Sequence, residues 1–226
     1  MTPSSLTLTR SLLLLLVLSL FGCATESSHT VAPQQVTSAN TSYNGPRSTL
    51  AVGKFDNRSN FMRGLFSDGV DRLGSQAKTI LITHLQQSNR FSVVDRDNMG
   101  EIQQEAKIRG KEQSLKGAHF VLTGDVTEFG RKETGDQQLF GILGRGKTQV
   151  AYSKVSINVV NALTSEVVFS VQGAGEYALS NREIIGFGGT SSYDSTLNGK
   201  VLDLAIREAV NRLVEGLERG AWKPEN

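Results

Sequence analysis

The stretch Lys154-Val-Ser-Ile-Asn-Val-Val-Asn-Ala-Leu-Thr-Ser-Glu-Val-Val-Phe-Ser-Val-Gln172 carries the clearest structural signal in this sequence. Its apolar residues alternate with polar ones on either side of the polar turn from Asn161 to Ser165. This pattern is typical of two antiparallel strands that face a core on one side and water on the other. The stretch therefore predicts a β-hairpin that is buried on a single face.

The residues before this hairpin indicate alternating strands and helices. We expect strands over 49–55, 91–94 and 119–123, a helix over about 69–88, and a short helix with Asp97 as its N-cap. The order strand, helix, strand, helix, strand with short connections favours an α/β layer with some parallel pairing.

The residues after the hairpin predict a loop and a last helix. Gly and Ser are frequent over about 180–199, where we expect a loop. Apolar residues then recur at helical spacing over 202–217, Gly220 would end the helix, and Trp222 would fold back onto the domain. The sequence thus predicts one α/β domain over 48–226, with a mixed sheet, flanking helices and an antiparallel hairpin.

The N-terminal residues are typical of an exported lipoprotein. Arg10 precedes the apolar run from Ser11 to Phe21. This run is too short to span a hydrocarbon core of ~30 Å but fits the apolar part of a signal peptide. It ends in Leu20-Phe-Gly-Cys-Ala24, which resembles the bacterial lipobox. The resemblance implies that residues 1–22 are a signal peptide and that Cys23 is lipidated; the alternative is an ordinary cleaved signal with an incidental cysteine.

The residues after Cys23 predict where this anchor holds the protein. Two or more acyl chains keep a protein stably on a membrane. Ala24 is not the aspartate that tends to retain Gram-negative lipoproteins in the inner membrane, so the resemblance implies the outer membrane. Residues 24–47 are rich in Ser, Thr, Asn, Gln and Pro and lack apolar periodicity. We therefore expect 23–47 to be a lipidated flexible tether, with the folded domain facing the periplasm.

Composition narrows the possible partners. The chain has 226 residues and a formal net charge of +2, so nothing in its charge balance indicates nucleic acid as a partner. It contains one cysteine, which excludes an intramolecular disulfide.

The stretch Gly141-Ile-Leu-Gly-Arg-Gly-Lys-Thr148 matches the pattern G-x-x-x-x-G-K-[ST] of a phosphate-binding loop. Such a loop needs a helix after it, because the helix N-terminus helps to hold the phosphates. Here the residues from Gln149 to Ile157 alternate as a strand instead, and the expected compartment lacks ATP. We predict that 141–148 form a Gly-rich hairpin tip.

No other motif indicates catalysis, a cofactor or a metal. The sequence contains three histidines, His29, His84 and His119. None has metal-ligand spacing with a cysteine or carboxylate. Ser75 and Lys78 fit Ser-x-x-Lys but lack the partner motifs of that site, and Asp95 and Asp97 suit a turn or a helix cap. We expect no catalytic, cofactor-binding or metal-binding residues, and therefore no enzyme.

Five segments in order resemble the CsgG/HfaB family, whose namesake is the outer-membrane lipoprotein that secretes curli subunits. They are Ala51-Val-Gly-Lys-Phe-Asp-Asn-Arg-Ser59, Phe91-Ser-Val-Val-Asp-Arg-Asp97, Phe120-Val-Leu-Thr-Gly-Asp-Val126, the hairpin from Val155 to Val167, and Glu218-Arg-Gly-Ala-Trp222. The resemblance covers about 48–222. It implies a periplasmic α/β domain that can assemble into a ring.

The channel of that family lengthens two β-hairpins per subunit to cross the membrane, and the regions corresponding to them here are 127–153 and 172–200. The first carries charges that do not alternate cleanly with apolar residues, and the second is loop-like around Gly186 to Asn198, so a lipid-facing stripe is weak in both. Long paired strands with an apolar band would favour a pore, whereas short and charged segments would favour a regulator.

The family's pore constriction corresponds to the stretch from Asn57 to Gly69, which contains no tyrosine. The constriction chemistry is therefore not evident in this chain. Phe61, Leu65 and Phe66 give the stretch some apolar character, and we expect them to pack down rather than to form a contact site.

Three hypotheses follow. The first is a CsgG-family outer-membrane lipoprotein for the export or assembly of surface fibres or another envelope structure, acting through contacts with other envelope proteins and as a possible homo-oligomeric ring. The second is a non-pore periplasmic regulator similar to LpoB, a lipoprotein that activates a peptidoglycan synthase and has a similar domain on a flexible tether. The third, an enzyme, would need a nucleophile, base or metal cluster in a cleft.

Overall fold

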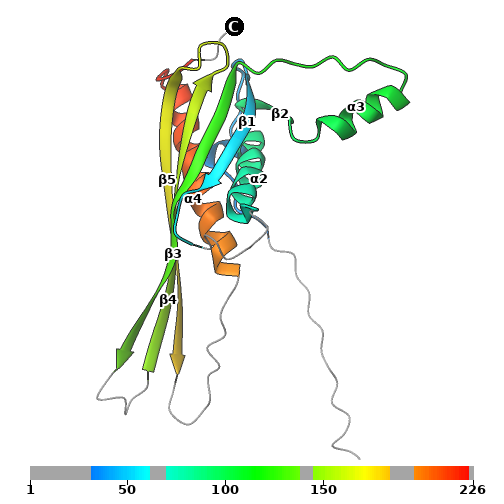
Figure 1. Cartoon of the computed structure of the whole chain (residues 1–226). Coiled ribbons are helices and arrows are strands. Elements are labelled where there is room, and N and C mark those ends of the chain that lie inside the picture. The colour runs from blue at the N-terminus through cyan, green and yellow to red at the C-terminus, as the bar shows by residue number, and fades with distance from the viewer. Residues whose placement is uncertain (1–31, 62–69, 138–144, 184–195, 224–226) are drawn as a thin grey trace, which may run out of the picture. The chain divides into compact units, whose positions relative to one another are not determined.

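The computed structural model describes residues 32–61, 70–137, 145–183 and 196–223, with side chains left out at 133–137, 145–147, 179–183 and 196–197. The elements in chain order are the 3₁₀ helix η1 (Thr37–Asn40), β1 (Ser48–Asn57), α2 (Arg72–Gln87), β2 (Phe91–Val94), α3 (Met99–Ile108), β3 (Phe120–Gln137), β4 (Arg145–Asn161), β5 (Val167–Glu183) and α4 (Thr196–Glu218). Figure 1 shows this arrangement.

The five strands form one mixed sheet in the order β2-β1-β3-β4-β5. β1 runs parallel to β2 and β3, while β4 is antiparallel to both β3 and β5. The expected parallel pairing and the expected hairpin of β4 and β5 are therefore both confirmed, and the chain has the predicted α/β fold.

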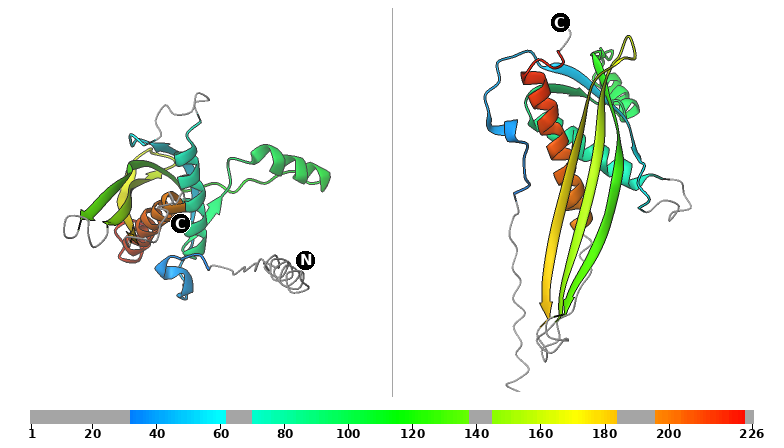
Figure 2. Two further views of the ribbon diagram at one scale, coloured as in Figure 1. Left: turned by 90° about the horizontal axis from the view of Figure 1, so that it is seen from below. Right: turned by 90° about the vertical axis from the view of Figure 1, so that its left-hand side faces the viewer.

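Helices α2 and α4 cover one face of this sheet (Figure 2). On β4 the alternate residues Val155, Ile157 and Val159 are fully buried beneath the helices, whereas Ser156 and Asn158 between them are half-buried on the open face. α2 begins at its N-cap Asp71, whose carboxylate accepts a hydrogen bond from the Gly74 amide at 2.8 Å. The one wet face predicted from the alternation is thus confirmed.

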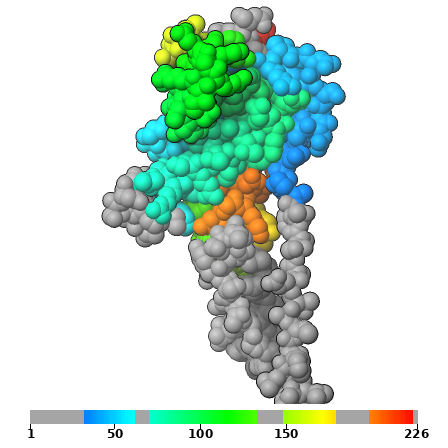
Figure 3. Space-filling model, turned by 90° about the vertical axis from the view of Figure 1, so that its right-hand side faces the viewer, coloured from blue at the N-terminus to red at the C-terminus, as the bar shows by residue number. Residues whose placement is uncertain are grey.

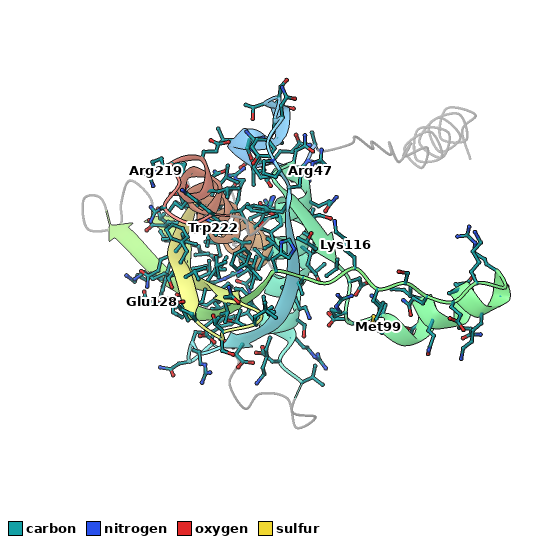
Figure 4. The ribbon with its side chains drawn as sticks, turned by 90° about the horizontal axis from the view of Figure 1, so that it is seen from above. Arg47, Met99, Lys116, Glu128, Arg219 and Trp222 are labelled. Carbon is teal, nitrogen blue, oxygen red and sulfur yellow. The ribbon has the colours of Figure 1, made fainter. Side chains whose placement is uncertain are left out.

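The C-terminal residues close the core as expected. Gly220 has φ +70°, and its amide donates to the Leu217 carbonyl at 3.0 Å, which ends α4 with a left-handed residue. Trp222 is only 4% exposed, and its Nε1–H donates to the Leu213 carbonyl at 3.3 Å. Figure 4 shows the Trp222 side chain turned into the space between α4 and the sheet.

Helix α3 lies on an arm that leaves the body of the domain (Figures 1 and 4), and none of its residues is buried. The expected N-cap was wrong, because the helix is preceded by Asn98, which makes no side-chain cap bond. Asp97 instead pairs with Lys78 of α2 at 2.5 Å. Asp95 forms the turn, since it accepts hydrogen bonds from the Asp97 amide at 2.9 Å and the Asn98 side chain at 2.6 Å.

The expected bounds of one loop and one strand differ from the structure. Of the stretch 180–199 that was expected to be a loop, residues 180–183 belong to β5 and residues 196–199 to α4, while 184–195 lie outside the described residues. The third strand was expected over 119–123, yet β3 has 18 residues. Strand pairing uses backbone groups, so it continues through residues that are too polar to predict a strand from apolar alternation.

The residues just before β1 also differ from expectation. The stretch 35–47 was expected to lie within the flexible tether, but the compact folded unit begins at Gln35. Val36 is 2% exposed and joins the hydrophobic core. In the space-filling view these N-terminal residues, in blue, lie against the surface of the domain (Figure 3).

Candidate interaction surface

The longest strands of the sheet continue past the helices. β3 and β4 pair from Phe120 opposite Asn161 to Gln137 opposite Arg145, with one shift of register between Val126 and Glu128. β5 pairs with β4 as far as Glu183. We call residues 127–137, 145–154 and 174–183 the strand extension. Its far end lies beyond the first turn of α4 (Figures 1 and 2).

Both side edges of the strand extension are open in the part of the chain that the structure describes. β1 pairs with β3 only as far as Asn57 opposite Val126, so β3 has no strand beside it from Thr127 onward. β5 is the last strand of the sheet and pairs with β4 alone. Unpaired strand edges present rows of backbone donors and acceptors, which are ready to pair with another strand.

The described side chains on the open face of the extension form charged and aromatic pairs. Lys154 Nζ lies 2.8 Å from Glu128 Oε1, and Lys132 Nζ lies 5.2 Å from the centre of the Tyr152 ring. Tyr152 covers Gly130, where an added Cβ would lie 2.6 Å from the tyrosine hydroxyl. The described part of this face is therefore polar, and the Tyr152 ring makes a cation–π contact with Lys132.

The helix-covered face of the extension is also partly polar. Arg131 Nε donates to Asn198 Oδ1 of α4 at 3.0 Å. Gln149 and Ser153 flank Ala151 on β4; both side chains are buried, and neither Gln149 Oε1 nor Ser153 Oγ has a hydrogen-bond partner among the described residues. A buried oxygen without a partner costs about 1–3 kcal/mol, so we expect this part of the sheet to be less stable than the core beside it.

The far end of the extension includes part of the stretch 141–148, which was expected to be a Gly-rich hairpin tip. Of the stretch 141–148, residues 141–144 lie outside the described residues, while 145–148 form the start of β4. Thr148 pairs with Thr134 and Ser180 in the middle of the three strands. The helix that a phosphate-binding loop requires is therefore absent at this place, where the structure describes a strand instead.

The other residues singled out in the sequence have structural contacts. Ser75 Oγ donates to the Asp71 carbonyl at 2.8 Å, and Lys78 pairs with Asp97, as expected of a polar helix face. His84 is 2% exposed, and its Nε2 lies 2.8 Å from Asp203 Oδ1, which joins α2 to α4. The sequence alone did not reveal this pair, because its members are 119 positions apart. Among the described residues, no group of three or more His, Cys, Asp and Glu side chains could hold a metal ion.

The remaining residues singled out in the sequence lie mostly outside the described residues. These include Cys23, the expected lipidation site, and His29, for which no site was expected. Phe61 is described, and its ring packs against Phe129 with a centroid distance of 4.6 Å, whereas Leu65 and Phe66 are not described. None of the described helices is long and apolar enough to cross a membrane.

The class of protein that the fold defines is a single α/β domain with one mixed five-stranded sheet. The family model of the curli production assembly/transport component CsgG matches residues 32–226, so the chain belongs to the CsgG family. It is also 68% identical over 206 residues to the "Putative lipoprotein NMB1126/NMB1164" of Neisseria meningitidis serogroup B, covering 91% of this chain and 92% of that one. Neither description names an enzyme.

Two solved structures are similar to this chain at low sequence identity. The PelC dodecamer from Paraburkholderia phytofirmans is 15% identical, with a TM-score of 0.34 and coverage of 75% of this chain and 93% of that one. The C-terminal domain of LpoB from Salmonella enterica is 16% identical, with a TM-score of 0.31 and coverage of 58% and 85%. The family assignment follows from the family model and the close relative.

Proposed function

We propose that this protein is a lipid-anchored envelope protein that acts through protein–protein contacts and assembles with copies of itself along the strand extension. Lipid on Cys23 would hold it on the outer membrane, with the domain in the periplasm on a tether. Its role would be the export or assembly of surface fibres, curli-like or of another kind, or of another envelope structure. The observation that carries the proposal is the pair of open edges on β3 and β5.

The direction of the two edges supports assembly into a ring. β3 and β5 are both antiparallel to β4, so they run in the same direction. β5 of one copy can therefore pair in parallel with β3 of the next copy while both copies keep the same orientation. Such head-to-tail contacts generate a closed ring when the rotation between copies closes.

A cross-linking experiment tests this contact on the detergent-extracted full-length protein. Glu128 and Glu176 are exposed on the two edge strands. A bismaleimide should link E128C of one copy to E176C of the next, which gives cross-linked dimers and higher multiples of the chain. The matched control pairs E128C with E166C, since Glu166 is exposed but precedes β5. The assembly proposal would be wrong if E128C and E176C gave only monomers and native mass spectrometry also gave a monomeric mass.

The anchor is tested separately. The C23S variant should lose incorporation of labelled palmitate and leave the membrane fraction, whereas S28A in the same N-terminal stretch should retain both. Retention of C23S in the outer membrane with no label would contradict the lipid anchor while leaving the assembly proposal standing.

The charge of the extension counts against a pore, which leaves a periplasmic regulator of an envelope enzyme as the second candidate function. The extension is long, as a pore would need, but charged residues stand at both alternating positions of its strands: Lys132, Glu133, Asp136, Arg145, Lys147, Arg182 and Glu183. Charges that face lipid at mid-membrane cost about 2–4 kcal/mol each for Arg or Lys. Conductance in planar bilayers would support the pore, and rings without conductance would support assembly in the periplasm.

A further inference from the structure

One arginine makes most of the side-chain hydrogen bonds that hold the segment between the tether and β1 on the domain. Arg90 lies between α2 and β2 and is 4% exposed. Its Nε and Nη2 donate to Glu218 Oε1 of α4 at 2.9 and 2.7 Å, and its Nη1 donates to the Ser88 carbonyl at 3.1 Å. These bonds fix the planar guanidinium, so its remaining donors point in a defined direction.

Those donors bind the segment from Val36 to Tyr43, which we call the N-terminal latch. Nη2 donates to Thr41 Oγ1 at 2.8 Å, and Nη1 lies 3.3 Å from the Ser38 carbonyl and 3.4 Å from the Thr41 carbonyl. The Tyr43 ring lies over the guanidinium, 4.7 Å from Cζ. The latch is therefore bound by charge-assisted hydrogen bonds and a cation–π contact that all use the same side chain.

The latch leaves a partly open pocket against the domain. The pocket has a volume of about 330 Å³ and lies between latch residues and α4, with Ser38, Asn211 and Glu215 among its walls. Ser38 Oγ is buried and has no hydrogen-bond partner among the described residues. Val36 is the one large apolar side chain that the latch places in the core. Besides Val36 and Arg90, the latch is held by a hydrogen bond from the Thr37 amide to Asn211 Oδ1 of α4 at 3.0 Å and by Ala39, which packs against the core. These few contacts must offset the conformational entropy of eight ordered residues.

We propose that the N-terminal latch is a releasable strap that sets the length of the tether. This inference rests on the proposed lipid anchor at Cys23. With the latch docked, residues 24–35 link the anchor to the domain and reach at most ~40 Å when fully extended. With the latch released, residues 24–47 form the link, and the reach doubles to ~80 Å. Docking keeps the domain close to the membrane, and release lets it reach partners deeper in the periplasm.

Hydrogen exchange of the full-length protein in detergent tests the docking itself. The wild-type amides of 36–43 should exchange more slowly than those of a free peptide, and V36D should raise their exchange about tenfold or more while exchange within β4 stays unchanged. T41V should raise exchange less. S42A removes the neighbouring hydroxyl as its control and should have no effect, since Ser42 is exposed. Free-peptide exchange in the wild type, or no effect of V36D, would overturn the latch.

Energy transfer tests the length of the tether. A donor dye on L163C, an 89% exposed position, reports its distance to acceptor lipids in vesicles of phosphatidylethanolamine and phosphatidylglycerol. V36D should lower the transfer relative to wild type, and S42A should not. If the protein fails to bind vesicles, the lipid anchor fails and the exchange result stands alone. If V36D binds and the transfer is unchanged, the latch does not set the reach.

Discussion

Strands β3, β4 and β5 pass through two environments without changing their partners. Under the helices, the covered side of β4 consists of Val155, Ile157 and Val159, all fully buried. In the strand extension the same side of β4 carries Gln149 and Ser153. The pairing continues through both parts because it depends on backbone groups, whereas stability depends on what the side chains contact. One sheet can therefore have a firm half, which is the part under the helices, and a less stable half, which is the strand extension. Substitutions at Trp222, Gly173, Gln149 and Ser153 test that contrast.

The largest loss of stability should come from Trp222, which closes the core under the helices. Trp222 packs against Phe91, Phe120 and Phe169, with ring centroids 6.0, 5.5 and 6.3 Å away. Trp222→Ala should lower the free energy of unfolding by about 3–5 kcal/mol, because it leaves a cavity among these rings. Urea denaturation followed by circular dichroism measures the loss. Trp222→Phe should cost clearly less, and equal costs would show that the rings do not pack as described.

A smaller effect should follow from the contact between α4 and β5. A Cβ added at Gly173 would meet the Ala205 carbonyl oxygen and lie 2.5 Å from the Ala209 amide nitrogen. Gly173→Ala should therefore cost about 1–3 kcal/mol through overpacking. Gly100→Ala is the matched control, since nothing lies within 4 Å of that position in α3. The same denaturation curves should show the control unchanged or slightly stabilised.

The extension should respond in the opposite direction. Gln149→Leu and Ser153→Ala remove the two buried oxygens without partners, so each should leave the free energy of unfolding unchanged or raise it by about 1 kcal/mol. Calorimetric melting temperatures of the two variants test this. A marked fall of the melting temperature in either variant would mean that its oxygen has a hydrogen-bond partner in solution. The polar groups in this half of the sheet would then be as fully hydrogen-bonded as those in the other half.

The smallest effect concerns the exposed turn before α3. Hydrogen bonds from the Asn98 side chain and the Asp97 amide lower the pKa of Asp95 below its ordinary value. The folded pKa lies below the unfolded pKa of about 3.9, so the stabilisation is present above that pH and is lost as pH falls through the folded pKa. Asp95→Ala should lower the unfolding midpoint slightly at pH 6 and not at pH 2. An equal difference at both values would exclude the carboxylate as its cause.

The sequence predicted the firm half better than the extension. Alternation revealed the hairpin because Val155, Ile157 and Val159 face a core, and the helical spacing over 202–217 revealed α4 for the same reason. In the extension, alternation indicated only the part of β4 from Gln149 onward, and the polar stretches of β3 and β5 gave no such signal. The expected strand at 119–123 was therefore too short, and the expected loop at 180–199 was too long.

Contacts between distant residues were beyond the sequence for another reason. Arg90 and Glu218 are 128 positions apart, and Val36 is a single apolar residue in a polar stretch. Neither has a periodic pattern that would predict its partner. Trp222 was predicted correctly because a tryptophan after a helix stop has few other ways to be buried.

The close approach of α4 to β5 also limits how this sequence can diverge. At Gly173 and Gly175 the backbone of α4 occupies the place of a side chain, and an added Cβ at Gly175 would lie 2.9 Å from the Val201 carbonyl oxygen and the Ala205 amide nitrogen. No mutation to another amino acid at either position preserves this spacing. Related sequences in which α4 packs on β5 in this way should retain both glycines, whereas other residues should replace Gly100.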